Sequence, residues 1–231
     1  MTAIAETGLF RISPVVNESV RCYDPGSCER DSILKALATM ESEAHDMPCV
    51  IAGRDVRSGT LADAVMPHRH AHVLGQAHQA RPNDVLAAIA AAKGASREWA
   101  RLPWTERAAI FLKAADLLSG PWRNRLNAAT MLGQSKTVHQ AEIDSAAELI
   151  DFWRFNVSFA RRIYEDQPLC SPGTWNRIDY RPLEGFVLAI TPFNFTAIAG
   201  NLPSAPALMG NTVVWKPAAT AMLSAHLIMQ L

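Results

Sequence analysis

Two polar residues, Asn194 and Lys216, stand where apolar stretches of the chain end. Asn194 follows the run 186–190, and Lys216 follows the run 212–215. We expect both runs to be buried strands of an open parallel sheet, which builds ligand crevices at the carboxyl ends of its strands. Lys216 is the one formally charged side chain from position 185 onward, and a buried charge without a partner is costly. A bound polyanion or sugar would supply that partner, so the pattern predicts a ligand crevice.

The chain around these residues follows the order strand, helix, strand, helix, which is typical of an α/β sheet. We expect strands at 186–190 and 212–215, with helices at 196–209 and from 219 onward. Gly210 stands just after the first of these helices, where a left-handed glycine commonly ends a helix. A parallel sheet is covered on both faces, so two such strands are an incomplete sheet.

The first 181 residues predict mainly helices, with short strands before and after residue 60. Ser27 is placed to cap a helix that runs to about residue 45, while Asn83 and Thr105 are placed to cap helices at 84–99 and 106–118. The other elements that we expect are an irregular arm at 1–25, strands at 49–52, 62–66 and 73–75, helices at 122–131 and 138–165, a linker at 167–173 and an extended strand at 174–181.

The composition of the chain favours a globular protein that does not bind nucleic acid. Hydrophobic residues make up 49% of the chain and charged residues 19%, which supports a packed core and excludes extensive disorder. Lysine and arginine together number 22, as do aspartate and glutamate, so the formal net charge is zero. Nucleic-acid binding requires a basic face, and the sequence shows none.

The N-terminus and the cysteines predict a cytoplasmic location. Residues 1–6 have neither a basic region nor an apolar region of the kind that directs secretion. The uncharged stretch 185–215 is long enough to span a membrane, but proline, glycine and asparagine interrupt it, so we expect a soluble core instead. The cysteines lack Cys-x-x-Cys spacing, which favours free thiols in a reducing compartment; they are Cys22, Cys28, Cys49 and Cys170.

Three histidines at alternate positions, His68, His70 and His72, offer a second kind of site. Alternate residues of a strand share one face, so these side chains could bind a metal ion together. Pro67 precedes them, and no cysteine or carboxylate ligand stands nearby. The sequence therefore favours a solvated turn between two strands over a metal site.

The residues around Asn194 and Lys216 resemble the aldehyde dehydrogenase superfamily. The two segments that carry the resemblance are Thr191-Pro192-Phe193-Asn194-Phe195 and Gly210-Asn211-Thr212-Val213-Val214-Trp215-Lys216-Pro217. Within that superfamily the chain is similar to the 1-pyrroline-5-carboxylate dehydrogenase branch, and Phe193, where other branches usually carry tryptophan, favours the same branch. The further segments that match this branch are 133–137, 140–144, 148–156 and 205–211.

The resemblance implies an α/β fold of the aldehyde dehydrogenase type. It would comprise an N-terminal helical region and the first two strands of an incomplete Rossmann-type parallel sheet. Residues 1–47 would form an arm and a helix, and residues 48–181 the N-terminal part of the fold with its strands and long helices. Residues 182–231 would be the truncated start of the NAD-binding domain.

The resemblance also implies NAD as the cofactor and places its binding residues. Lys216 would hydrogen-bond the hydroxyl groups of the adenosine ribose. Ile190, Thr191, Pro192 and Phe193 would contact the cofactor, the first three through their backbone near the nicotinamide. A lysine that only extends from a strand end into solvent is the alternative for Lys216.

The reaction implied by the resemblance is the oxidation of L-glutamate γ-semialdehyde to L-glutamate in proline degradation. Asn194 would donate its amide N–H to the oxyanion that forms when a thiolate adds to the aldehyde, and losing such a donor costs about 2.7–4 kcal/mol. The alternative is an asparagine that satisfies backbone groups in a turn. Phe195 would line the substrate tunnel, or would merely pack in the core. Glu142 would lie near the substrate ammonium, or would be an exposed helix residue.

The catalytic cysteine and glutamate of the superfamily follow the dinucleotide fold, and no cysteine of this chain stands in a matching motif. After residue 221 the chain also lacks a helix stop signal, so we expect the amino-terminal part of a longer protein. When complete it would be a homo-oligomer that acts on a small aldehyde; the present chain alone would be inactive. Two alternatives stay open: a non-catalytic truncated product or interaction remnant, and a dehydrogenase for a different semialdehyde.

Overall fold

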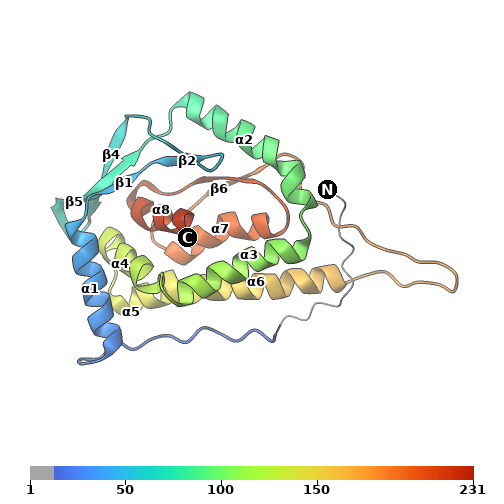
Figure 1. The fold of residues 1–231 in the computed structure, drawn as a ribbon, viewed down its shortest axis with the longest axis horizontal. Coiled ribbons are helices and arrows are strands. Elements are labelled where there is room, and N and C mark those ends of the chain that lie inside the picture. The colour runs from blue at the N-terminus through green and yellow to red at the C-terminus, as the bar shows by residue number, and fades with distance from the viewer. Residues whose placement is uncertain (1–12) are drawn as a thin grey trace.

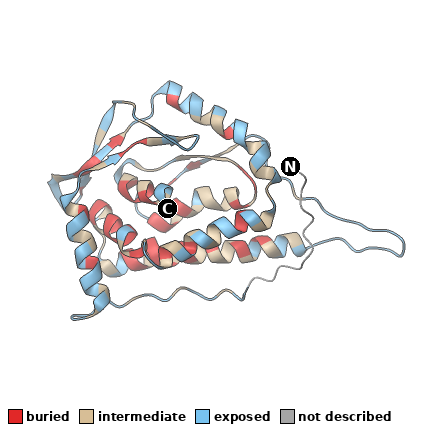
Figure 2. Cartoon of the chain, viewed as in Figure 1, coloured by how far each residue is buried: buried red, intermediate tan, exposed pale blue. Residues whose placement is uncertain are grey.

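A computed structural model describes residues 13–231, so the first part of the predicted arm lies outside the described residues. Figure 1 shows two long helices, α3 (Trp104–Ser119) and α6 (Glu148–Glu165), lying side by side. Helix α7 (Thr196–Leu208) packs against both of them. The main core lies between these helices and α4 (Arg123–Gln134), as the buried residues in Figure 2 show.

The N-terminal strands form two small sheets. Strand β5 (Arg69–His78) pairs in parallel with β1 (His45–Met47) and antiparallel with β4 (Leu61–Met66). Strands β2 (Cys49–Ile51) and β3 (Arg54–Val56) form an antiparallel pair. The predicted strands at 49–52 and 62–66 are confirmed, whereas β1 and β3 were not predicted and β5 is longer than the expected 73–75.

Two of the three predicted helix caps are wrong. Helix α1 (Cys28–Ser42) begins as expected, because the Ser27 side chain accepts a hydrogen bond from the Arg30 amide. Helix α2 (Pro82–Arg101), however, has Arg81 rather than Asn83 as its N-cap, and Pro103 rather than Thr105 precedes α3. The helix starts earlier at Pro82 because the fixed φ of proline suits the first helical position.

The predicted long helix at 138–165 is continuous, but its geometry changes in the middle. It comprises α5 (Val138–Ala141), a π-helical segment (Glu142–Ala147) and α6. At the junction with α6, the Glu148 amide donates to the Ile143 carbonyl, five residues back. Such a π turn inserts one extra residue into a helix and is frequently found at functional sites.

The prediction of an extended strand at 174–181 is wrong. Residues 166–186 form a segment that projects from the body of the molecule in Figure 1. The Ile178 amide donates to the Gln167 side chain at 2.9 Å, and the Tyr180 hydroxyl donates to the Asp166 carbonyl at 3.1 Å. A strand needs a neighbouring strand for its backbone groups, and none of the described strands pairs with this segment.

Strands β6 (Val187–Ile190) and β7 (Val213–Lys216) form the predicted parallel pair, with Ile190 opposite Lys216. Gly210, at φ +89°, ends the connection after α7, as predicted. After β7 come a short 3-10 turn (Ala219–Ala221) and α8 (Met222–Gln230). The strands are not buried on both faces as expected, because Leu188 is 56% exposed and Ile190 63% exposed. No helix within residues 13–231 combines the length and the hydropathy that crossing a membrane requires.

Gly75 provides a test of the parallel pairing between β1 and β5. A Cβ atom at this position would overlap the backbone carbonyl of His45, the residue opposite in the register. We expect Gly75→Ala to lower the free energy of unfolding by about 1–3 kcal/mol, because the two backbones must move apart. Gly94→Ala on α2 is the matched control, since a Cβ there meets open space and helical alanine stabilises by roughly 0.5–1 kcal/mol. Urea unfolding measures both, and equal effects would contradict this account.

Candidate functional site

The ends of strands β6 and β7 are joined at the position where the site was predicted. Thr191 is buried, and its hydroxyl accepts a hydrogen bond from the Trp215 indole N–H at 2.9 Å. The Thr191 amide also donates to the carbonyl of Lys216, at 3.3 Å. These bonds fix the start of the turn 191–195 relative to β7, so Asn194 and Lys216 both lie at the carboxyl edge of the strand pair.

The residues of the turn become exposed as the chain leaves β6. Pro192 is half-buried, Phe193 is 66% exposed, and Phe195 is 40% exposed. Asn194 is exposed, and its side chain has no hydrogen-bond partner within residues 13–231. The alternative in which this amide satisfies backbone groups of the turn therefore finds no support in the described contacts.

Lys216 is exposed rather than buried, so the argument that burial of its charge demands a ligand is wrong. Its predicted position is confirmed, because it ends β7 at the same edge as the Asn194 turn. Among the described residues it has no ion pair, which leaves its ammonium free to donate to a ligand. Its role in binding the cofactor stays a prediction.

A buried charge cluster that sequence reasoning missed lies beneath the turn. The Lys136 ammonium is 2.8 Å from Asp144 Oδ2 and 4.5 Å from the centre of the Phe195 ring. The same carboxylate oxygen accepts a hydrogen bond from the Thr196 amide at 3.2 Å. Lys136 belongs to the segment 133–137, which matches the dehydrogenase branch, so a signal was present in the sequence although no role was assigned to it.

Glu148 is electrostatically coupled to this cluster. Burial raises the pKa of its carboxyl group, and the negative charge of Asp144 raises it further. Lys136 lowers the pKa in part, but the net shift is upward. A raised pKa makes this carboxyl group more readily neutral than an ordinary glutamate, and a cation beside it would favour its ionised form.

The structure does not support a substrate contact for Glu142. Its side chain is fully buried, and both carboxylate oxygens accept hydrogen bonds from the Arg123 guanidinium. The Arg21 amide, the Tyr23 hydroxyl and the Asn127 side chain also donate to it, at 2.8, 2.7 and 2.8 Å. The alternative of an exposed helix residue is also wrong. The sequence could not reveal this burial, because all the partners are distant in the chain.

The ion pair between Arg123 and Glu142 also fastens the described part of the arm. Glu18 accepts hydrogen bonds from Arg123 and Arg154, each at 2.6 Å, and its amide donates to Asp151 at 2.7 Å. Burial alone would raise the pKa of Glu142, but the hydrogen bonds from Arg123 and its other donors outweigh burial and lower it. The pKa of Glu18 is lowered by the same balance, with Arg123 and Arg154 as its donors.

The histidines and cysteines take other positions. His68 is 2.8 Å from the Ser135 hydroxyl and His72 is 3.0 Å from the Glu41 carbonyl, so their rings bond to different segments. No group of three or more potential metal ligands gathers within residues 13–231. Cys49 is half-buried, and burial raises the pKa of its thiol, whereas the other three cysteines are exposed.

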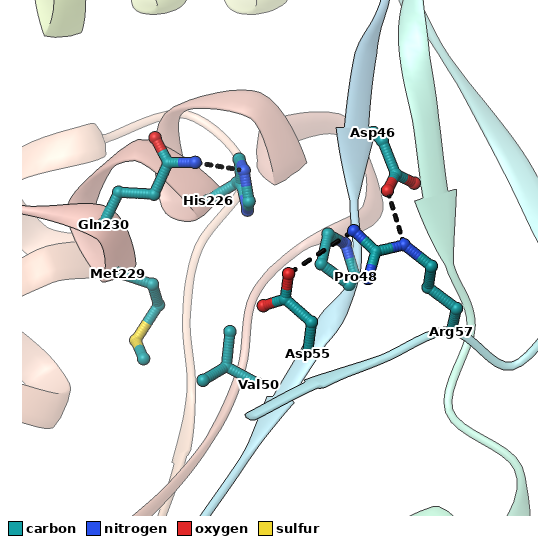
Figure 3. A pocket seen from close by; sticks show the side chains of 8 residues that line it. All are labelled: Asp46, Pro48, Val50, Asp55, Arg57, His226, Met229 and Gln230. Atoms are coloured by element: carbon teal, nitrogen blue, oxygen red, sulfur yellow. Dashed lines mark hydrogen bonds and ion pairs between the residues drawn. The ribbon is translucent and has the colours of Figure 1, made fainter. Parts of the chain in front are cut away.

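A pocket of about 380 Å³ lies elsewhere, between α8 and strands β1 to β3 (Figure 3). Arg57 is paired there with Asp46 at 2.8 Å and with Asp55 at 3.4 Å. His226 lies beside Gln230 at 2.8 Å, and burial lowers the pKa of the imidazole. None of the predicted site residues lines this pocket, and its charged groups already have partners, so we assign it no ligand.

The geometry at the strand ends agrees with comparisons to known proteins. Residues 55–231 match the aldehyde dehydrogenase family. The chain belongs to this family. The resemblance of the sequence motifs and the expected fold class are thereby confirmed.

Similar proteins in this family share one activity in their names. Delta-1-pyrroline-5-carboxylate dehydrogenase of Agaricus bisporus is 52% identical over 99% of the chain, and the mitochondrial enzyme of that name from Mus musculus is 49% identical over 93%. A crystal structure of the Mycobacterium tuberculosis enzyme bound with NAD is 57% identical over 97% of the chain, with a TM-score of 0.95. The chain spans 42%, 38% and 42% of the lengths of these three proteins.

Acid should weaken the fold through Glu18 and Glu142. Their lowered pKa values mean that the unfolded chain binds protons below the ordinary value of 4.5 before the folded chain does. The stabilisation of the fold by these two ionised carboxylates is complete above about pH 4.5, and it is lost as the pH falls through their pKa values in the folded chain. Glu142→Gln should remove about 3–5 kcal/mol at neutral pH, since it takes from the buried Arg123 guanidinium the carboxylate that bonds to its Nε and Nη2 atoms and leaves Glu18 as its ion-pair partner.

Urea unfolding at a series of pH values measures this effect. The loss of stability on acidification should be smaller in Glu142→Gln than in the unchanged chain. Glu165→Gln is the control, because Glu165 is half-exposed and pairs with Arg161 across one helical turn, an interaction worth about 0.3–0.5 kcal/mol. If Glu142→Gln and Glu165→Gln lowered the free energy of unfolding at neutral pH equally, the buried ion pair would not stabilise the fold.

Proposed function

We propose that the complete protein oxidises L-glutamate γ-semialdehyde, the open form of 1-pyrroline-5-carboxylate, to L-glutamate with NAD. One observation carries the proposal: the parallel strands β6 and β7 bring the exposed amide of Asn194 and the exposed ammonium of Lys216 to one edge. Open α/β sheets bind their ligands at this edge. The names and identities of the similar proteins support the choice of substrate and cofactor.

The residues at this edge fit a dinucleotide. Lys216 offers three N–H donors on a flexible stem, which suits the adjacent hydroxyl groups of a ribose. Bonding between Thr191 and Trp215 keeps the backbone at 190–192 in a fixed position beside β7. We therefore assign cofactor contacts to Ile190, Thr191, Pro192 and Phe193. NAD, when bound, supplies the acceptor for the hydride that leaves the substrate carbon.

Asn194 is the catalytic residue that this chain contributes. Its side-chain amide donates a hydrogen bond to the aldehyde oxygen as negative charge develops there. Because the amide has no partner among the described residues, it needs to break no existing bond before doing so. The thiolate that attacks the aldehyde and the carboxylate base that activates water are expected outside this chain, and a glutamate-activated water would release the acid.

We assign the two ends of the substrate to different residues. Phe195 is part-exposed beside Asn194 and offers an apolar surface to the methylene groups of the semialdehyde. The substrate ammonium requires a carboxylate, and Glu142 is already occupied by Arg123. Glu148 takes this role in the proposal, because it is half-buried and follows Asp144 by four residues in the same continuous helix, and no described residue forms an ion pair with it.

The expected homo-oligomer and cytoplasmic location remain proposals. The projecting segment 166–186 exposes Leu169, Trp175 and Leu183, an apolar surface of the kind that a second copy could cover. Light scattering of the complete protein gives its mass in solution and decides the oligomeric state. Fractionation of the source cells decides the location.

Kinetics of the complete protein test the residue assignments. Asn194→Ala should lower kcat by about 10²–10³, because an oxyanion donor acts in the transition state. Lys216→Met should instead raise KM for NAD by about tenfold or more, since it removes a charge-assisted hydrogen bond worth roughly 1.5–3 kcal/mol. Lys35→Met, an exposed lysine on α1, serves as the control and should change neither constant. An unchanged kcat in Asn194→Ala would refute the oxyanion role.

Substrate comparison tests the proposed function itself. NADH formation should be faster with glutamate γ-semialdehyde than with succinate semialdehyde, which lacks the ammonium group. The reverse preference would identify a dehydrogenase for a different semialdehyde. The 231-residue chain alone should form no NADH. Turnover by the pure chain would show that it contains a catalytic nucleophile after all. Binding of a partner protein by an inactive complete protein would favour the interaction remnant.

A further inference from the structure

Asp144 is a buried carboxylate in the π-helical segment, only 4% exposed. Its Oδ2 atom accepts two hydrogen bonds, from the Lys136 ammonium at 2.8 Å and from the Thr196 amide at 3.2 Å. Its Oδ1 atom is buried and has no protein partner among the described residues. Burying a carboxylate to this degree costs free energy unless the charge is paired and hydrogen-bonded.

The bond to Thr196 makes Asp144 a cap for helix α7. Thr196 is the first residue of that helix, and the preceding residue, Phe195, has no side-chain oxygen with which to cap it. The first amides of a helix lack partners within the helix, and negative charge at this end is favourable. Asp144 therefore supplies from another helix the acceptor that the local sequence does not provide.

The bond to Lys136 links Asp144 to the ring of Phe195 as well. The ammonium lies 4.5 Å from the ring centre, within the range of a cation–π interaction. Asp144 fixes the ammonium in this place, because the two groups are largely buried together. One carboxylate thus contacts the residue after Phe195 directly and the Phe195 ring through Lys136.

The π segment holds a second buried carboxylate, Glu142, which bonds to Arg123 and the arm. Glu142 and Asp144 stand two residues apart, which places them on nearly opposite sides of a helical turn. The anchoring of Glu142 thus fixes the rotation of the segment that directs Asp144 toward α7.

We propose that Asp144 is a positioning residue for Asn194, which it orients by fixing the start of α7 and, through Lys136, the ring of Phe195. The inference rests on the proposed function, because Asn194 matters for the reaction only if it is the oxyanion donor. An ion pair that only stabilises the fold would affect all of α6 and α7 alike, whereas a positioning residue acts on the turn 193–196.

Amide hydrogen exchange of the 231-residue chain tests the proposal without any activity. In Asp144→Ala the amide of Thr196, which loses its acceptor, and the amide of Ala199, which bonds to the Phe195 carbonyl at 3.0 Å, should exchange at least tenfold faster, while the core amides of α4 and α6 keep their rates. Asp151→Ala is the matched control, because this carboxylate of α6 bonds to Asn17 and the Glu18 amide in the arm. The control should loosen the arm and leave the exchange of the Thr196 and Ala199 amides unchanged. A uniform acceleration in Asp144→Ala, or no acceleration, would overturn the proposal.

Asp144→Asn keeps the inference testable if the alanine variant does not fold. The amide has the shape of the carboxylate and still accepts from Thr196, but charge-assisted hydrogen bonds are roughly twice as strong as neutral ones. We expect an acceleration of about three- to tenfold, again confined to the amides of Thr196 and Ala199. A rate equal to that of the unchanged chain would show that the charge of Asp144 does not position the turn.

Kinetics of the complete protein separate the two proposals. Asp144→Asn should lower kcat and leave KM for NAD unchanged, and Lys136→Arg should retain activity that Lys136→Met loses, because arginine keeps the cation over the ring. A complete protein without dehydrogenase activity would refute the proposed function and leave the exchange result valid. Uniform exchange in an active enzyme would refute only the positioning role.

Discussion

The buried ion pair between Arg123 and Glu142 joins the arm, helix α4 and the π segment, which are separate in the sequence. Removing both charges from water is costly, so the pair is favourable only because further hydrogen bonds satisfy the groups around it. Those bonds come from the arm, through Arg21, Tyr23 and Glu18. The arm, helix α4 and the π segment consequently depend on one another, and none of them can shift without exposing or unpairing a buried charge.

The two buried carboxylates of the π segment have different roles: Glu142 stabilises the fold, and Asp144 positions the start of α7. Glu142 attaches the segment to α4, whereas Asp144 reaches the first residue of α7. Asn194, the proposed oxyanion donor, precedes that helix by two positions, so we expect the contacts of Asp144 to influence where its side chain lies. A π turn suits this arrangement because the extra residue alters which side chains face which neighbour.

Local signals in the sequence were sufficient for much of the fold. Ser27 caps α1 and Gly210 adopts a positive φ, as their residue types predict, and the strand pair follows from two short apolar runs. Asn83 and Thr105 were misplaced as caps, because the rule for capping residues competes with the preference for proline at a helix start. At the site, the motifs placed Asn194 and Lys216 at one edge of the sheet.

What the sequence could not show depends on partners that are distant in the chain. Glu142 reads as an ordinary helix glutamate, because the residues that bury it are 15 or more positions away. The link from Lys136 to Phe195 is hidden for the same reason. The π turn was not predicted either, because residues 142–147 contain no glycine or proline that would mark a change in the helix.

The arm has a consequence for the order in which the protein acquires its structure. Glu18 bonds to Arg154, which lies 136 positions later in the chain. A ribosome that adds about 5–20 residues per second makes Arg154 roughly 7–27 seconds after Glu18. Contacts between such distant residues carry a large loop-closure entropy and form slowly. The part of the arm around Glu18 is therefore expected to form its native contacts late, after helix α6 has been synthesised.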